Sequence, residues 1–228
     1  MLSRAAELHG EMKKEYAASL SSQQITDRAL NLTHEVLEKC ANTLDQLMTL
    51  AWSVRIKPSL PKPPSRGGYF PAARDEQSFK STMGQWQAAD IDARDPGFAK
   101  VLRSIQPMAG AENRWLADLR EIVGKKHTHL VPQVRTERKW VKAESAAGSV
   151  SYDPGAVTFA PGAVKIFGVP VSARSQLPLP SESLSVTVET WVGFNIEGTG
   201  YNALGFCAEC IKRTESIIDV FERELGLK

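Results

Sequence analysis

The spacing of hydrophobic residues changes twice along this chain. In residues 30–54 and again in 204–225, apolar side chains recur every three or four positions, which is the period of an amphipathic α-helix. Between about 131 and 200 the period drops to two, which indicates half-buried β-strands. The pattern therefore predicts helices at both ends of the chain, with a sheet between them.

The N-terminal part is expected to hold two long helices. The first covers residues 3–20 and is followed by a break at Ser21-Ser22, and the second ends before Pro58, since proline cannot continue a helix. The apolar positions of the second helix alternate three and four residues apart, as in a helix that packs against other helices. These positions are Leu30, Thr33, Leu37, Cys40, Leu44, Leu47, Ala51 and Val54.

Three shorter helices are expected after a Pro/Gly-rich connector at 57–68. The first begins near Asp75, a good N-cap residue. The second is bounded by prolines within 95–107, and the third covers 111–127 and buries a stripe of aromatic and aliphatic side chains. The members of that stripe are Trp115, Leu116, Leu119, Ile122 and Val123.

The final helix keeps the spacing of three and four over its whole length, which is typical of a helix docked on a bundle. Its expected buried positions are Leu204, Cys207, Ile211, Thr214, Ile218, Phe221 and Leu225. The predicted fold is α+β and mainly α. It consists of a helical bundle over residues 1–130, an antiparallel β insertion over 131–203, and a C-terminal helix over 204–228 that returns to the bundle.

Composition narrows the class of protein. The first residues lack the uninterrupted apolar core of a signal peptide, and no apolar run approaches the roughly 18 residues of a membrane span, so we expect a cytoplasmic protein. The 28 basic and 26 acidic residues nearly cancel, so a nucleic-acid site would have to be local. Three cysteines, an odd number, argue against a disulfide framework.

Two of the cysteines have the spacing of a metal-binding pair. Zinc takes four ligands, however, and no second pair accompanies Cys207 and Cys210. Cys207 and Cys40 both fall on apolar stripes, so we interpret them as small hydrophobic residues in the core. No metal ion or other cofactor is expected.

The segment LREIVGKKHTHL (119–130) holds an arginine and a histidine with complementary chemistry. Arg120 and His127 are seven residues apart, which in a continuous helix leaves them within roughly 20° of the same face. A guanidinium binds phosphate, and an imidazole transfers protons near neutral pH. The pair suits metal-free cleavage of an RNA phosphodiester, with Arg120 as the phosphate clamp and His127 as the acid or base.

Basic residues gather around this pair. Residues 120–142 contain seven Lys or Arg and two Glu, a formal charge of +5, whereas the whole chain carries +2. Together with a tryptophan that could stack on bases, this patch predicts a nucleic-acid surface. Its expected members beyond the catalytic pair are Lys125, Lys126, Arg135, Arg138, Lys139 and Trp140.

The same residues have a simpler interpretation. Lys and His in the last turn of a helix complement the helix dipole, and many helices end in this way. A polar stripe on the second long helix includes His34, Glu38 and Asp45, and these residues would either orient the groups of the 111–127 helix or face water. The sequence leaves both interpretations open.

Three segments resemble a group of uncharacterised bacterial proteins with HEPN-like character: VLEKCANTLDQLMTLAW (36–52), YFPAARDEQSF (69–79) and WLADLREIVGKKHTHLV (115–131). The shared motifs are Thr43-Leu44-Asp45-Gln46-Leu47, Phe70-Pro71 and Lys126-His127. The resemblance implies a helical bundle, often dimeric, in which many members carry an Arg-x(4–6)-His motif and cleave RNA without a metal.

Two functions are compatible with these features. The first is a nucleic-acid-interacting, HEPN-like protein with metal-independent endoribonuclease activity, which the resemblance places in a defence or toxin-type system. The second is a non-catalytic binding or scaffold module that acts through dimerisation of the bundle and through the β insertion. RNA and a second copy of the chain are the expected partners, and a membrane is not.

Overall fold

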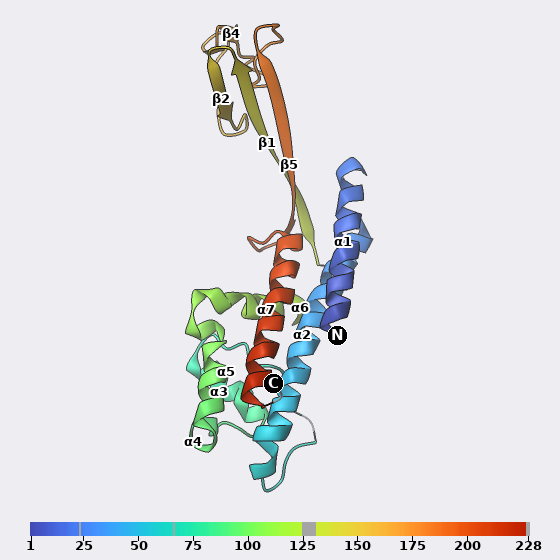
Figure 1. The fold of residues 1–228 in the computed structure, drawn as a ribbon, viewed down its shortest axis with the longest axis vertical. Helices are drawn as coiled ribbons and strands as arrows, with labels where there is room; N and C mark the ends of the chain where they lie inside the picture. The colour runs from blue at the N-terminus through green and yellow to red at the C-terminus, as the bar shows by residue number, and fades with distance from the viewer. Residues whose placement is uncertain (23, 66, 125–130, 227–228) are drawn as a thin grey trace. The chain divides into compact units, whose positions relative to one another are not determined.

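The computed structural model describes residues 1–22, 24–65, 67–124 and 131–226. Helices lie at both ends of the chain, and strands lie between them (Figure 1). The fold is α+β and mainly helical, with a three-stranded antiparallel sheet before the last helix, as the hydrophobic pattern predicts. No helix in the described residues is long and apolar enough to cross a membrane.

The chain divides into two compact units. A helical unit comprises residues 1–133 and 196–228, and a β unit comprises residues 134–195. The helices are α1 (Leu2–Ser22), α2 (Asp27–Arg55), α3 (Glu76–Gln85), α4 (Ile91–Arg94), α5 (Pro96–Ser104), α6 (Arg114–Gly124) and α7 (Ala203–Glu224). The strands are β1 (Gln133–Ser145), β2 (Gly148–Tyr152), β3 (Lys165–Ile166), β4 (Val169–Pro170) and β5 (Ser185–Ile196).

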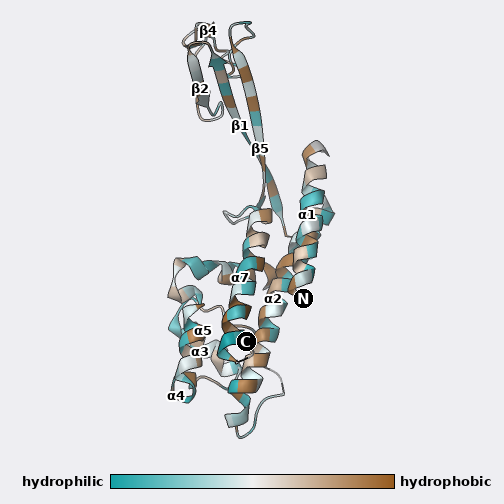
Figure 2. Ribbon diagram, in the orientation of Figure 1, coloured by the Kyte–Doolittle hydropathy of each residue, from teal (hydrophilic) through white to brown (hydrophobic). Residues whose placement is uncertain are grey.

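The core of the helical unit forms where α1, α2 and α7 contact one another. Figure 2 shows hydrophobic residues along α2 and α7. The predicted stripe of α2 is buried from Thr33 to Ala51, whereas Val54 near its end is 50% exposed. Leu8 of α1 and Phe221 of α7 are also buried. Removal of this apolar surface from water, at about 25 cal/mol per Å², drives the three helices together.

The buried face of α7 differs in part from the expected stripe. Cys207, Thr214 and Phe221 are buried as predicted, but the other four predicted positions are only half-buried, namely Leu204, Ile211, Ile218 and Leu225. Residues 210 and 217 are buried in place of Ile211 and Ile218. Successive residues of a helix are 100° apart, so sequence spacing alone does not select between neighbouring positions. The selection comes from the helices around α7, which contacts α1, α2 and α6.

Side-chain caps set where several helices begin. The hydroxyl of Thr26 accepts a hydrogen bond from the N–H of Ala29 at 3.1 Å and caps α2. Asp75 caps α3 as predicted, and Ser78 returns a bond to complete a capping box. Asp95 caps α5 in the same way. Each cap contributes about 1 kcal/mol, which matters for helices as short as α3 and α5.

In the β unit the strands are ordered β2–β1–β5. β1 and β2 are antiparallel, with Val141 opposite Tyr152, and β3 and β4 form a separate two-stranded hairpin. On one face of β1, Ala143 forms a small core with Val169 and Leu184. The segment between β2 and β5 therefore covers one face of the sheet.

The thiols of Cys40, Cys207 and Cys210 are buried, which should make them unreactive in the folded protein. Removal from water raises the pKa of Cys40 to about 12 and also raises the pKa of Cys207 and Cys210. Because the thiolate is the reactive form, we expect iodoacetamide to leave the folded protein unmodified near neutral pH and to modify all three thiols in urea. Mass spectrometry counts the adducts. A thiol that reacts in folded protein as fast as in urea would contradict its burial.

Candidate functional site

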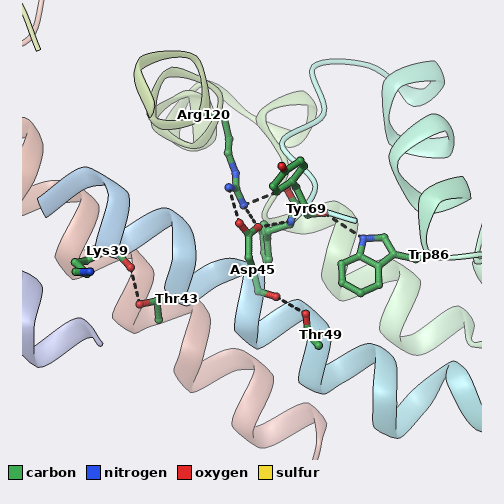
Figure 3. A network of polar contacts seen from close by, with 8 residues as sticks. Lys39, Thr43, Asp45, Thr49, Tyr69, Trp86 and Arg120 are labelled. Carbon is green, nitrogen blue, oxygen red and sulfur yellow. Dashed lines mark hydrogen bonds and ion pairs between the residues drawn. The ribbon is translucent and has the colours of Figure 1, made fainter. Parts of the chain in front are cut away.

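Arg120 lies on α6, and its guanidinium points toward α2 (Figure 3). Its two terminal nitrogens donate to the two carboxylate oxygens of Asp45, Nη1 at 3.1 Å and Nη2 more closely. Nη2 also donates to the carbonyl oxygen of Phe70 at 3.4 Å. The side chains of the ion pair are only 20% and 22% exposed. Acceptors from two different segments therefore hold the guanidinium in place.

Asp45 joins three parts of the helical unit. Besides binding Arg120, its carboxylate accepts the backbone N–H of Phe70 at 2.7 Å. Phe70 is buried, and its ring lies 5.9 Å from that of Phe221 on α7, measured between centroids. The ion pair thus connects α2, α6 and the segment before α3, and it holds Phe70 in the core.

The segment that carries Phe70 is also fixed from its other side. The indole N–H of Trp86 donates to the carbonyl of Tyr69 at 3.1 Å (Figure 3), and the Trp86 carbonyl accepts the indole N–H of Trp52 at 2.8 Å. A Cβ atom on Gly67 would lie 1.7 Å from the Trp86 ring, so only glycine fits there. Phe70 and Pro71 are therefore packed inside the helical unit.

These contacts bear on the predicted catalytic pair. Asp45 occupies the terminal nitrogens that a phosphate clamp needs, and Nε of Arg120 is buried with no hydrogen-bond partner among the described residues. A phosphate would have to compete with a carboxylate for the same edge of the guanidinium. His127 lies outside the described residues, as do Lys125 and Lys126.

Three residues of α2 were expected to orient this site. Asp45 contacts Arg120, as that hypothesis requires. His34 and Glu38 precede Asp45 by 11 and 7 positions, which places them roughly 16 and 10 Å from it along a helix that rises 1.5 Å per residue. Both are half-buried, but they lie too far along α2 to share the contact of Asp45 with Arg120.

The predicted basic patch is divided between the two faces of β1. Side chains alternate along a strand, so Arg135 and Lys139 share the face of the buried Val141. Arg138 and Trp140 point to the opposite face. The strand therefore separates four residues that the sequence predicted to act together.

A hollow of about 550 Å³ opens on the face of the sheet that carries Arg138 and Trp140. These two residues line it together with Glu189 and Trp191 of β5. Trp140 is 38% exposed and Trp191 is 67% exposed. Sequence reasoning missed Trp191, because only the pairing of β5 with β1 brings it close to Trp140. Trp191 follows Glu189 by two positions, so in an alternating strand both side chains lie on the same face. That spacing is the sequence signal that could have identified Trp191.

Charge in the β unit is nearly balanced. Residues 134–195 contain six basic and five acidic side chains. Arg138 donates through Nε to Asp153 at 2.8 Å, and this hydrogen bond holds the pKa of the Asp153 carboxyl below its ordinary value. Arg135 is paired with Glu137. Neighbouring carboxylates therefore offset much of the positive charge that the sequence suggested, and exposed pairs of this kind contribute little to stability.

A second hollow, of about 540 Å³, lies in the helical unit beside α6. Its lining includes Asp118, which is buried and accepts a hydrogen bond from the hydroxyl of Tyr201; this bond raises the pKa of Tyr201. Arg74 and Arg114 approach Asp118 to 3.8 and 3.7 Å. With Glu121 also in the lining, the two arginines face two carboxylates. The hollow therefore has no surplus positive charge with which to attract an anion.

Among the described residues, no group of three or more His, Cys, Asp or Glu side chains could hold a metal ion. Compared with known protein families, curated proteins and solved structures, the chain has no significant match. The resemblance to HEPN-like proteins therefore stays a prediction that rests on short motifs.

We expect Arg120→Ala to lower the free energy of unfolding by about 1–3 kcal/mol, because it leaves the partly buried Asp45 carboxylate without its charged partner. Glu121→Ala is the matched control on α6. Its ion pair with Arg74 is about 60% exposed on both sides, so a change within about 0.5 kcal/mol is expected. Urea denaturation followed by circular dichroism measures both. Equal losses for the two variants would contradict a structural role for Arg120.

Proposed function

We propose that this protein is a non-catalytic binding module that holds single-stranded RNA against Trp140 and Trp191 of the β unit. The observation that carries the proposal is the hollow in which two exposed indoles meet an arginine and a glutamate. The proposal keeps the RNA partner expected from the sequence. It assigns the contact to the sheet rather than to the end of α6.

Two indoles on one open sheet face are suited to nucleobases. Every base has a flat π-face, and stacking on an aromatic side chain contributes about 1–3 kcal/mol per base in single-strand binding. The bases of a duplex are already stacked on one another, whereas those of a single strand are free to stack on protein. Trp140 and Trp191 therefore favour one short single-stranded segment as the ligand.

The two polar residues of the hollow complement such a segment. Arg138 is bonded only through Nε, to Asp153, so its terminal nitrogens have no hydrogen-bond partner in the described part of the chain. Its side chain is 71% exposed, and a guanidinium with free nitrogens donates well to phosphate oxygens. Glu189 can accept a hydrogen bond from the exocyclic amine of cytosine, which uracil lacks. We therefore expect a preference for cytosine over uracil.

The endoribonuclease hypothesis needs Arg120 to be available to phosphorus. Asp45 instead holds the guanidinium on the edge that would clamp a phosphate. Binding at the sheet does not require a phosphate to displace Asp45 from Arg120. For this reason we favour the non-catalytic function over cleavage by Arg120 and His127.

We expect Trp140→Ala and Trp191→Ala each to weaken binding of a short oligocytidine by roughly 5- to 100-fold, because each removes one stacking surface. Fluorescence anisotropy of a labelled oligonucleotide measures the affinity. Phe167→Ala is the matched control, since Phe167 lies in the same unit and is 38% exposed, as Trp140 is, but does not line the hollow. Equal affinity in all three variants and the wild type would contradict the proposal.

The salt dependence of the same binding adds a control. Arg138 is the one cation among the four lining residues, and each phosphate contact on a single strand contributes a slope of about −0.7 to log K against log salt. A slope near −1 or shallower is expected. A much steeper slope would point to a different, more basic surface.

The choice of RNA as the ligand has its own test. If the protein binds another protein through Trp191 and does not bind RNA, that choice is wrong.

The enzymatic alternative is tested by incubating RNA with the wild type and with His127→Ala in EDTA. We expect no cleavage by either protein, because Arg120 is engaged by Asp45. Gel electrophoresis of the RNA measures the outcome. Cleavage by the wild type that disappears in His127→Ala would show that the protein is a metal-independent ribonuclease after all.

A further inference from the structure

β5 is a long strand at the edge of its sheet. The order β2–β1–β5 places β1 on one side of it, and no other strand of the β unit, all of whose residues are described, pairs with its second side. Every residue from 185 to 191 is exposed. An edge of this kind presents a row of free backbone N–H and C=O groups, which form a template for pairing with another strand.

The exposed part of β5 lacks the usual protection against such pairing. Natural edge strands are blocked by lysine, proline or a bulge, but the run SVTVETW contains no Lys, Arg or Pro and only one charge, Glu189. Val186 and Val188 are 37% and 41% exposed. β-Branched residues fill most of the run and favour an extended backbone. The strand is therefore suited to recruit a partner strand.

Within the exposed run 185–191, the free backbone groups belong to the even-numbered residues. At the end of the strand, the N–H of Glu197 donates to the carbonyl of Pro132 at 2.9 Å, on the side of β1. The N–H of Ile196 is bonded instead to the turn that follows the strand. Backbone groups alternate sides along an extended strand, so those of Val186, Val188 and Thr190 point away from β1.

The exposed run is compatible with pairing to itself. A two-fold axis at Val188, the midpoint of residues 185–191, places each Val188 opposite its own copy in an antiparallel pair. Glu189 then faces Thr187, and Trp191 faces Ser185. If the axis moved by one residue toward the C-terminus, Glu189 would face Glu189, and like charges directly opposite each other are destabilising. The sequence thus permits a self-pairing that is centred on the exposed run and free of charge repulsion.

We infer that β5 is the dimerisation strand of this protein, and that its free edge pairs antiparallel with β5 of a second copy around an axis at Val188. The result is one continuous six-stranded sheet. A two-fold axis perpendicular to that sheet puts the Trp140–Trp191 hollows of both copies on the same face. The inference concerns the strand edge and not the hollow, so it stands whether or not the hollow binds RNA.

The test is a symmetric cross-link at the proposed axis. In Val188→Cys the two new thiols would face each other across a pair whose Cα atoms lie about 5.5 Å apart, a distance that a disulfide spans. The three native thiols are buried and do not compete. Mild oxidation is expected to convert most of the Val188→Cys protein to a covalent dimer on a non-reducing gel. Val186→Cys, which would face Thr190 of the second copy, is the control and should cross-link far less.

The mass in solution provides a second measurement. Light scattering after size-exclusion chromatography should give twice the 25.0 kDa chain mass for the wild type and for Val188→Thr, which keeps the backbone N–H. Val188→Pro removes an N–H that points away from β1, so the strand can remain in its sheet while the dimer is lost. Val188→Lys should also give a monomer and covers the case in which the proline variant fails to fold. A monomeric wild type, a dimer that persists in both variants, or equal cross-linking at 186 and 188 would overturn the inference.

Discussion

The packing of α7 against α1 and α2 is the interaction on which the rest of the structure depends. α7 comes after the β unit in the chain, so the helical core is complete only when the chain has left the bundle at residue 133 and returned at residue 196. The exit and the return are held together by the bond from Glu197 to Pro132. The two strands that begin and end there therefore become neighbours in the sheet. That pairing places Trp140 and Trp191 beside the same hollow.

The Asp45–Arg120 pair shows how a catalytic motif and a structural ion pair resemble each other in sequence. An arginine on a helix face, near a histidine and several lysines, has the chemistry of a phosphate clamp. Its role is decided by what lies opposite, and here a partly buried carboxylate on another helix accepts two of its hydrogen bonds. Removing one member of such a pair is costly because the other is left without its counter-charge. Asp45 and Phe70 belong to the motifs that resemble HEPN-like proteins, and their contacts give those motifs a structural explanation that needs no catalysis.

Local signals predicted the helices and strands well. The cap at Asp75, the stripe of α2 from Thr33 to Ala51 and the strands between about 131 and 200 depend on neighbours within a few residues, and the structure confirms all three. The stripe of α7 was only partly correct, because residues 210 and 211 are equally acceptable in a repeat of three and four. The choice of Cys210 over Ile211 depends on where α1, α2 and α6 lie, and that information is not contained in the spacing within one helix.

The sequence by itself determined the order and type of the elements, the insertion of a sheet before the last helix, and the burial of Cys40 and Cys207. Hydrophobic period, turn residues and caps are local properties, and each can be identified within a window of one or two helical turns. Only the tertiary structure decided which polar residues act together. It separated Arg135 and Lys139 from Arg138 and Trp140, because a strand directs alternate side chains to opposite faces. It also brought Asp45 to Arg120 and Trp191 to Trp140, residue pairs 75 and 51 positions apart, whose proximity depends on how the helices and strands pack against one another.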